Sequence, residues 1–474
     1  MKTMKKLLAV ILAMTLTMAM GICASASSQG GGDGDGTNAA PKGSITVTNA
    51  IVGETYTLYK VFNATVANGR ADEGTGISYT STWFTKEMAA TCKYFDVDDS
   101  GNITIKPEGK KDSGELSDGA IAWLKDQKIS NFTKIGQPVK ATSTTVKWED
   151  LDPGYYYIDT TTGSFVTVDS ITPNVNVEDK NSLPSHDKKQ ATAADGTFGD
   201  DLLELNIGDT VYYQTDITIG KGSDKAITLT DTMTSGLDLN QSAITVKKGG
   251  ETVPASNYDL TPSAHGFTLV LKADYVVKTL SETDVVTVAY SAVINSSAAI
   301  DSATGNSNEA KLEYSQQTAT DTVYVATYDF QLFKTDGSAE HTYLPGAKFK
   351  LYDALTGGNL IKVNKDNTGY YLDSTADVEI EVNSADGVNV RGLKPGTYYL
   401  EETEAPSGYN KLTERKPVTI TSKQDKPHEV YVENHAGAEL PSTGGRGTTL
   451  LYAIGAALVI GAAVLLIARR RTEQ

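Results

Sequence analysis

Short segments in which apolar and polar residues alternate recur through this sequence, and they constrain the fold more than any other feature. They lie at residues 45–47, 55–59, 166–168, 226–229, 268–271, 285–290, 348–351 and 430–432. Turn-forming residues separate them, and the chain is rich in Thr and Tyr, with 24 Tyr. Because successive side chains of a strand face opposite sides, the pattern predicts an all-β chain of tandem immunoglobulin-like β-sandwich domains. One minor helix is expected at residues 115–128, in the first domain.

An internal repeat relates the two ends of the folded part. Residues 151–158 (LDPGYYYI) echo residues 393–400 (LKPGTYYL), and residues 53–59 (GETYTLY) echo residues 346–352 (GAKFKLY). Self-similarity of this kind indicates duplicated structural units. We therefore expect the first and third domains to be versions of one sandwich.

Domain boundaries are expected near Lys180, ahead of the proline-containing linker 181–185, and near Thr327, where the strand pattern changes. A glycine-aspartate spacer precedes the first domain. The expected division is a signal peptide (1–26), a flexible linker (27–40), an N-terminal domain (41–180), a middle domain (181–326), a C-terminal domain (327–439) and a C-terminal sorting region (440–474).

The N-terminus has the features of a secretory signal peptide. Lysines precede an apolar run at residues 7–20, and Ala24-Ser25-Ala26 then offers small residues for cleavage near Ala26. Cys23 raises the alternative of a lipoprotein, but Ile22 stands where a small residue would be needed. The chain is therefore expected to be secreted.

The C-terminus carries a motif ahead of a membrane-length segment. Residues 450–468 are apolar and long enough to span a bilayer, and three arginines follow at residues 469–471. The preceding residues Leu440, Pro441, Ser442, Thr443 and Gly444 resemble the LPxTG sorting signal of Gram-positive surface proteins. The resemblance implies that a sortase cysteine attacks the Thr443 carbonyl, releases the chain from Gly444 onward, and passes Thr443 to an amine. The helix would then be a temporary tether.

The net charge limits the classes of binding partner, and the cysteine content limits the ways in which the folded chain can be stabilised. The net charge of -17 argues against nucleic acid and anionic membranes as partners. Cys92 would be the sole cysteine after signal-peptide removal, so no intramolecular disulfide can form, and the role of Cys92 is left open. Secreted proteins often gain strength from disulfides. We therefore expect this chain to be strengthened by something other than a disulfide.

Three polar residues fall on apolar strand faces near the C-terminus. By alternation, Lys334, Glu402 and Asn434 each share a face with buried-type neighbours. A charge buried alone is costly, so the three should meet in one core. The alternative is that the strand ends fray and these side chains simply leave the core.

Residues 398–409 (Y-x-L-x-E-T-x-A-P-x-G-Y) resemble the E-box of Gram-positive pilins and of B-type collagen-adhesin (Cna-type) repeats. In that family a buried Lys and Asn condense to an isopeptide bond and release ammonia. The resemblance implies a Lys334–Asn434 bond with Glu402 as the catalytic acid. Burial lowers the pKa of a lysine, which leaves a neutral nucleophile, and raises that of a carboxylic acid, which can then polarise the amide.

The middle domain has a corresponding set of a lysine, an acid and an asparagine. Asp231 and Asn308 also fall on apolar faces. Residues 184–189 (PSHDKK) resemble the segment that carries the reactive lysine in middle domains of pilin backbones, where the residue after the Asp is usual. This implies a Lys188–Asn308 bond with Asp231 as the acid. Lys189 stays open as the alternative, because the segment does not alternate cleanly.

The first domain lacks such a set. In the internal repeat Thr160 takes the place of Glu402, and Asn49 takes the place of Lys334. Without the amine and the acid, we expect no isopeptide bond in this domain.

Residues 175–181 (VNVEDKN) resemble the pilin motif of shaft subunits, V-x-V-Tyr-Pro-Lys-Asn. Here Glu178 and Asp179 replace the Tyr and Pro, and Ile171 stands where Trp is common. The resemblance implies that Lys180 attacks the sortase-bound Thr443 of another subunit, giving a head-to-tail fibre. The alternative is an ordinary linker lysine.

These features together predict the backbone (shaft) subunit of a covalent pilus on the cell wall. Its partners would be a class C-type pilus sortase, a housekeeping sortase, other copies of itself, accessory pilins and peptidoglycan; a host adhesion ligand is left open. An anchored accessory pilin or adhesin that is not polymerised is the alternative. With five His, no Gx-Ser-xG motif and no clustered metal ligands, we expect no cofactor, no metal and no enzyme activity beyond self-catalysed bond formation.

Overall fold

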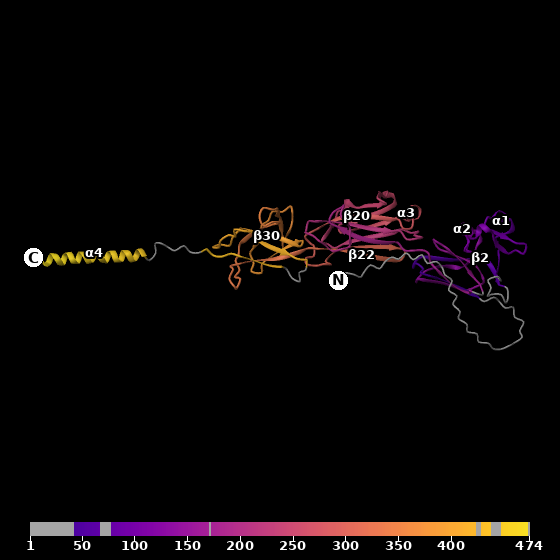
Figure 1. The fold of residues 1–474 in the computed structure, drawn as a ribbon, viewed down its shortest axis with the longest axis horizontal. Coiled ribbons are helices and arrows are strands. Elements are labelled where there is room, and N and C mark those ends of the chain that lie inside the picture. Colours follow the sequence, from indigo (N-terminus) through magenta and orange to yellow (C-terminus); the bar gives the residue numbers. More distant parts are fainter. Residues whose placement is uncertain (1–41, 67–76, 170–171, 423–427, 438–446, 473–474) are drawn as a thin grey trace, which may run out of the picture.

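The computed structural model describes residues 42–66, 77–169, 172–422, 428–437 and 447–472. Three β-rich bodies follow one another in a row, in sequence order, as Figure 1 shows. The predicted signal peptide and the predicted sorting motif at residues 440–444 lie outside the described residues. We keep the proposed boundaries near Lys180 and Thr327, because the strands on either side of each belong to different sheets.

The first body packs two main sheets around an apolar core. In one sheet β1 (Gly43–Thr48) lies between β10 (Asn174–Glu178), which is parallel to it, and β7 (Thr145–Leu151). The other contains β3 (Ile77–Thr80), β2 (Thr55–Val66), β8 (Gly154–Asp159) and β9 (Ser164–Val168), with β6 (Thr133–Lys140) also on β2. Ile45, Val47, Tyr56 and Leu58 meet between them.

A second, aromatic-rich core completes this body. It lies beneath α1 (Lys86–Thr91), α2 (Asp118–Asn131) and the hairpin of β4 (Phe95–Val97) and β5 (Ile103–Ile105), next to the 3-10 turn η1 (Pro107–Gly109). The helix expected at residues 115–128 is present with shifted ends. The sequence did not predict α1, because six residues are too few to establish a helical period.

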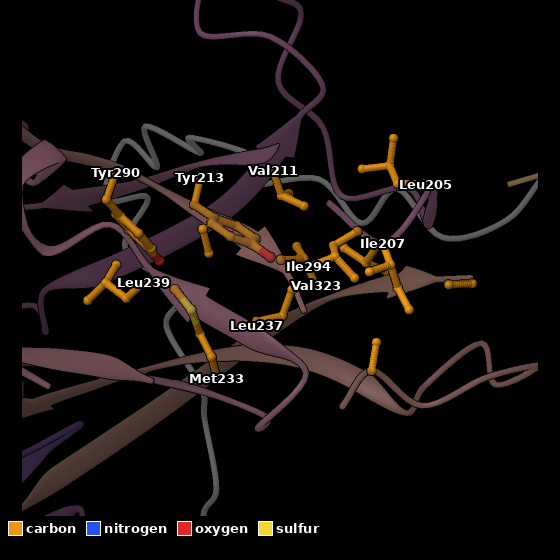
Figure 2. Packing of buried hydrophobic residues seen from close by; sticks show 14 of the residues in the cluster. Leu205, Ile207, Val211, Tyr213, Met233, Leu237, Leu239, Tyr290, Ile294 and Val323 are labelled. Carbon is orange, nitrogen blue, oxygen red and sulfur yellow. The ribbon is translucent and has the colours of Figure 1, made fainter. Parts of the chain in front are cut away.

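The middle body is a sandwich of two six-stranded sheets. One runs β11 (Ser185–Ala191), β13 (Thr210–Thr218), β20 (Val285–Ile294), β16 (Thr245–Lys248) and β17 (Glu251–Thr252), with β15 (Leu237–Leu239) on β20. The other runs β12 (Leu203–Glu204), β22 (Gln317–Ala326), β21 (Asn306–Tyr314), β14 (Ile227–Met233), β19 (Gly266–Leu271) and β18 (Tyr258–Ser263). Short helical elements, α3 (Ala273–Thr279), η2 (Gln241–Ala243) and η3 (Ala255–Asn257), lie in its connections. Figure 2 shows part of the core, where Tyr213 and Tyr290 lie side by side.

The third body is a smaller sandwich. One sheet runs β26 (Val363–Asp366), β27 (Gly369–Leu372), β29 (Val388–Leu393), β23 (Tyr328–Thr335) and β32 (His428–Glu433). The other runs β25 (Leu360–Ile361), β24 (Ala347–Tyr352), β30 (Gly396–Glu404) and β31 (Lys416–Ile420), with β28 (Ile380–Val382) on β24. The helix α4 (Gly447–Thr472) follows in sequence, and its segment Leu450–Arg471 is long and apolar enough to cross a membrane.

The topology repeats between the first and third bodies. The strand order β10-β1-β7 corresponds to β32-β23-β29, and β2-β8-β9 corresponds to β24-β30-β31. In each body the first strand pairs in parallel with the last. The repeated sequence segments lie on these equivalent strands, and all eight predicted strand segments fall in observed strands, residue 226 alone lying outside β14. The predicted all-β fold of tandem sandwiches is thereby confirmed.

Two carboxyl groups meet where the middle and third bodies join. The backbone N–H of Asp301 donates to the Thr327 carbonyl at 2.9 Å, and the Asp301 and Asp329 carboxyls lie next to each other, each with a buried oxygen that has no hydrogen-bond partner. Burial raises the pKa of Asp301 to about 7, and it raises the pKa of Asp329 as well. The folded state therefore holds a proton that the unfolded chain has already lost above about pH 4.

Folded stability should accordingly fall as the pH rises toward 7 and level off above it. In Asp301→Asn the amide cannot ionise, so this part of the pH dependence should disappear. Thermal unfolding of both proteins between about pH 5 and 8 measures the difference. Parallel pH profiles would contradict a shared proton at this junction.

Candidate functional site

Three strands of the third body place Lys334, Glu402 and Asn434 in its core. Lys334 lies on β23, Glu402 on β30, and Asn434 directly follows β32. Their exposed fractions are 0%, 1% and 1%. Because β23 and β32 run parallel with Lys334 opposite Val432, the lysine and the asparagine enter the core from neighbouring strands.

Glu402 and Asn434 are in direct contact. Asn434 Nδ2 donates to both Glu402 carboxyl oxygens at 3.0 Å and to the Asn410 carbonyl at 2.9 Å. The Leu412 N–H donates to Glu402 Oε2 at 2.8 Å. The acid is therefore positioned at the nitrogen that a condensation would release.

The Lys334 amine lies on the adjoining strand. Its Nζ donates to the Thr335 carbonyl at 3.0 Å and to the Val432 carbonyl at 2.9 Å. Burial lowers the pKa of Lys334 to about 8, although the Glu402 charge acts in the opposite direction. A much larger fraction of this amine than of an ordinary lysine is therefore neutral near pH 7.

The corresponding residues of the middle body converge more closely. Lys188 on β11, Asp231 on β14 and Asn308 on β21 are 0%, 2% and 0% exposed. Lys188 Nζ donates to Asp231 Oδ2 at 2.6 Å and also to the Tyr290 hydroxyl. Asn308 Nδ2 donates to the same hydroxyl at 3.3 Å. Burial lowers the pKa of Lys188, while Asp231 acts to raise it.

Tyr290 is the residue that the sequence did not single out. Its hydroxyl contacts all three of the predicted residues, because it also donates to Asp231 Oδ2. Its ring lies 5.2 Å from Lys188 Nζ and stacks on Tyr213 at 5.4 Å. The alternation along β20 could show only that Tyr290 faces inward, as many core tyrosines do.

The structure also separates the two candidate lysines of the middle domain. Lys189 is partly exposed and forms ion pairs with Asp187 at 2.6 Å and Asp216 at 3.6 Å. Lys188 is enclosed in the core with the acid. This placement supports Lys188 as the reactive lysine.

The equivalent place in the first body has a different character. Asn49 is exposed and donates through Nδ2 to Glu178 at 2.8 Å. The Thr160 hydroxyl accepts from the Gly163 N–H at 2.9 Å.

Cys92 is buried and unpaired. No group of three His, Cys, Asp or Glu side chains that could hold a metal was found among the described residues of the whole chain.

Lys180 lies just beyond the end of β10, where the chain passes from the first body to β11 of the middle body. Its side chain is exposed, while those of Asp179 and Asn181 on either side are partly buried. The amine is thus open to an enzyme, and the backbone that carries it is fixed. Lys188 and Lys334, being enclosed, have no such access.

The middle-domain set gives a direct prediction. Asp231→Asn keeps the shape of the side chain but removes the acid next to Lys188. If the predicted bond forms, intact-mass spectrometry of the wild-type chain should show the loss of ammonia from this pair, and the variant should retain it. Asp238→Ala, an exposed position in the same domain, is the matched control and should show the same loss of ammonia as the wild type, relative to the mass calculated from its own sequence. An Asp231→Asn chain that has lost as many ammonia molecules as the wild type would contradict the role of Asp231.

Three parts of the chain match known family models. Residues 207–318 match the Gram-positive pilin backbone subunit 2, Cna-B-like domain. Residues 328–436 match the SpaA prealbumin-like fold domain, and residues 432–473 match the LPXTG cell wall anchor motif. Among curated protein sequences none is significantly similar to the chain.

Several solved structures are similar. The T6 backbone pilin of serotype M6 Streptococcus pyogenes is 18% identical, with 80% of this chain and 81% of that chain covered and a TM-score of 0.50, a likeness that shows the fold. The full-length RrgB pilus protein from Streptococcus pneumoniae is 15% identical, with 86% and 100% covered and a TM-score of 0.46. The major pilin subunit BcpA of Bacillus cereus is 16% identical, with 83% and 99% covered and a TM-score of 0.42.

Proposed function

This chain carries the domains of a Gram-positive backbone (shaft) pilin and an LPXTG cell-wall anchor, and we propose that its copies are joined covalently from Lys180 of one subunit to Thr443 of the next. The anchor makes it a surface protein attached to the cell wall. As a sortase substrate of the pilin type, it is a structural subunit.

The exposure of Lys180 between two packed bodies is the observation that carries the proposal. Lys180 lies between β10 of the first body and β11 of the middle body, and its exposed side chain can be approached by an enzyme. In the sequence, the sorting motif follows the third body. A bond between the two therefore adds subunits along one direction and leaves both ends free to extend.

The proposed reaction exchanges one amide for another. A class C-type pilus sortase cleaves the bond between Thr443 and Gly444 and holds Thr443 as a thioester on its cysteine. The neutral Lys180 amine attacks the Thr443 carbonyl and displaces that cysteine. A housekeeping sortase then transfers the last subunit to peptidoglycan, and accessory pilins join by the same chemistry.

We further infer that each shaft subunit is cross-linked internally by two isopeptide bonds, Lys334–Asn434 and Lys188–Asn308. In each reaction the lysine nitrogen bonds to the asparagine Cγ, and the side-chain nitrogen leaves as ammonia with a proton passed through the acid. Glu402 contacts that nitrogen in the third domain. In the middle domain Asp231 contacts the amine, and Tyr290 bridges it to Asn308.

Peptide mapping of wall-extracted polymer tests the proposal. Digestion should release a branched peptide in which the Lys180 side chain is joined to the Thr443 carboxyl. A branch at Lys188, Lys189 or a lysine of the first domain would refute the assignment of Lys180. An anchored protein that stays monomeric beside an active pilus sortase would favour the accessory-pilin alternative.

A further inference from the structure

The residues on either side of Lys180 are held by hydrogen bonds that the motif resemblance does not include. Along residues 175–181 the side chains alternate between partly buried and exposed, and Lys180 is on the exposed side. Asp179 and Asn181 are on the opposite side, toward the first body. Whatever fixes these two neighbours therefore fixes the direction of the lysine.

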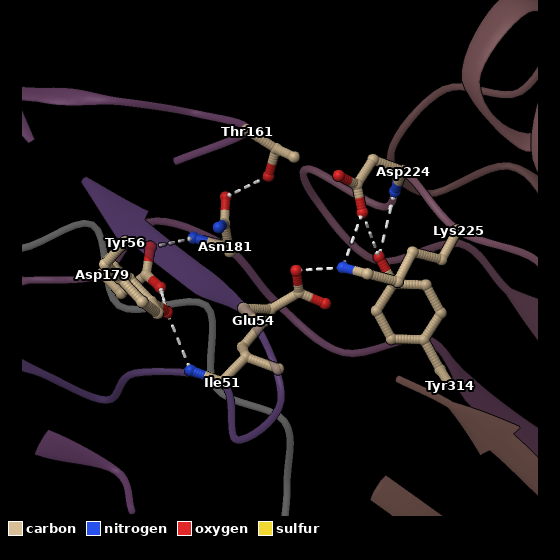
Figure 3. A network of polar contacts seen from close by, with 9 residues as sticks. All are labelled: Ile51, Glu54, Tyr56, Thr161, Asp179, Asn181, Asp224, Lys225 and Tyr314. Atoms are coloured by element: carbon tan, nitrogen blue, oxygen red, sulfur yellow. Dashed lines mark hydrogen bonds and ion pairs between the residues drawn. The ribbon is translucent and has the colours of Figure 1, made fainter. Parts of the chain in front are cut away.

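Asp179 is fixed by a core tyrosine. Its Oδ2 accepts from the Tyr56 hydroxyl, its Oδ1 accepts from the Asn181 N–H at 3.1 Å, and its own N–H donates to the Thr48 carbonyl at 2.9 Å. The Tyr56 oxygen in turn accepts from the Ile51 N–H at 2.9 Å, as Figure 3 shows. Burial and the bond to Asp179 raise the pKa of Tyr56, so its hydroxyl remains a donor at neutral pH.

Asn181 is fixed from both domains. Its Oδ1 accepts from the Thr161 hydroxyl at 3.0 Å. On the other side Gly222 of the middle domain packs against it so closely that a Cβ there would lie 2.4 Å from the Asn181 oxygen. The next residue, Ser182, donates its N–H to the Lys221 carbonyl at 3.0 Å.

An ion pair holds this middle-domain loop in place. Glu54 of the first domain pairs with Lys225, three residues beyond Gly222. The Lys225 amine also lies 5.9 Å from the ring centroid of Tyr314, and Figure 3 shows the two domains meeting at this point. The Glu54 side chain is only 12% exposed, whereas that of Lys225 is 41% exposed, so it is the carboxylate of this pair that is shielded from solvent.

The internal repeat shows that these polar atoms are not needed for the sandwich. In the third domain Phe349 takes the place of Tyr56, and Ala347 takes the place of Glu54. Both of those residues are 0% exposed and purely apolar. The third domain thus forms the same fold without a hydroxyl or a carboxylate at these positions. In the first domain the Tyr56 hydroxyl and the Glu54 carboxylate instead make polar contacts near the Lys180 segment.

We propose that Tyr56 and Glu54 are positioning residues that hold the Lys180 segment for attack on the sortase-bound threonine. This rests on the proposed role of Lys180 in polymerisation. In the motif that residues 175–181 resemble, a proline precedes the lysine and restricts the backbone. Asp179 has no ring, and its hydrogen bonds to Tyr56 and Asn181 supply the restriction instead.

The test measures transfer of a labelled LPSTG peptide onto the intact mature chain by a sortase that polymerises the wild type. Tyr56→Phe, which restores the repeat counterpart, should slow transfer to Lys180 about tenfold, the factor expected for losing one such hydrogen bond. Glu54→Ala should slow it as well. Thr161→Val, at an exposed position, is a second variant that leaves the core intact and should act in the same direction.

Matched variants separate positioning from folding. Tyr156→Phe removes a hydroxyl from the same core at the other end of the sheet, where it donates to the Asp152 carbonyl, and should transfer at the wild-type rate. Asp179→Asn keeps one acceptor oxygen of the two and should transfer more slowly than the wild type but faster than Asp179→Ala, which keeps neither. In every variant the ability of Thr443 to serve as donor should be unchanged.

The outcomes distinguish this inference from the proposed function. If Lys180→Arg still accepts the peptide, the role of Lys180 itself is wrong. If Lys180→Arg loses transfer while Tyr56→Phe, Glu54→Ala and Thr161→Val all match the wild type, the positioning role is wrong. Equal slowing in Tyr156→Phe would also overturn it, because the effect would then follow from core stability.

Discussion

Replacing Lys180 with arginine is expected to abolish the ladder of SDS-resistant polymers in cell-wall extracts. Arginine keeps the positive charge at this exposed position, but its guanidinium stays protonated and cannot act as the nucleophile. Monomer should still be attached to the wall through Thr443, because that reaction needs only the carbonyl side. Immunoblots of wall extracts from cells with an active pilus sortase measure both species.

Lys221→Arg is the matched control for this experiment. Lys221 is also an exposed lysine at the junction, where it pairs with Glu282 at 3.7 Å. It should leave the ladder intact. Thr443→Ala should remove both the ladder and the wall attachment. A ladder that survives Lys180→Arg would show that another amine is used.

Removal of Lys334 is expected to destabilise the third domain strongly. A covalent tie between Lys334 and Asn434 would close a loop of about 100 residues, and a cross-link of that span is worth about 4–5 kcal/mol in the chain-entropy description. For a domain of this size the loss corresponds to a fall in Tm of about 15–30 °C. Lys334→Ala should also leave Glu402 and Asn434 buried without the amine and open the domain to trypsin.

Glu402→Ala separates bond formation from packing. The lysine and asparagine remain, but the acid that contacts the leaving nitrogen is gone, so the variant should have lost one ammonia fewer than the wild type, each intact mass being compared with the mass calculated from its own sequence. Glu404→Ala, on the same strand but exposed and paired with Lys348 at 2.6 Å, should show the same ammonia losses and the same Tm as the wild type. A Glu402→Ala chain that has lost as many ammonia molecules as the wild type would contradict the proposed chemistry.

The sequence determined the strands and their buried faces because a period of two is a local property. The alternation around Asp231 and Asn308 put both on apolar faces, and the structure places both in the core. The repeat likewise predicted the shared topology of the first and third bodies, since similar local patterns select similar strand pairings. The sequence did not predict helix α1, because that helix is shorter than two turns.

Tertiary structure decided what no local pattern could. Residues 184–189 do not alternate, so only packing against the second sheet distinguished Lys188 from Lys189. Tyr290 was one inward tyrosine among several until the sandwich brought its hydroxyl between Lys188 and Asn308. Tyr56 and Asp179 meet although far apart in sequence, because β2, which carries Tyr56, belongs to the sheet that packs against the one in which β10 ends. Strand periodicity is fixed by neighbours along the chain, whereas these contacts depend on which strands pair and in what register, and that is settled only when the whole sandwich closes.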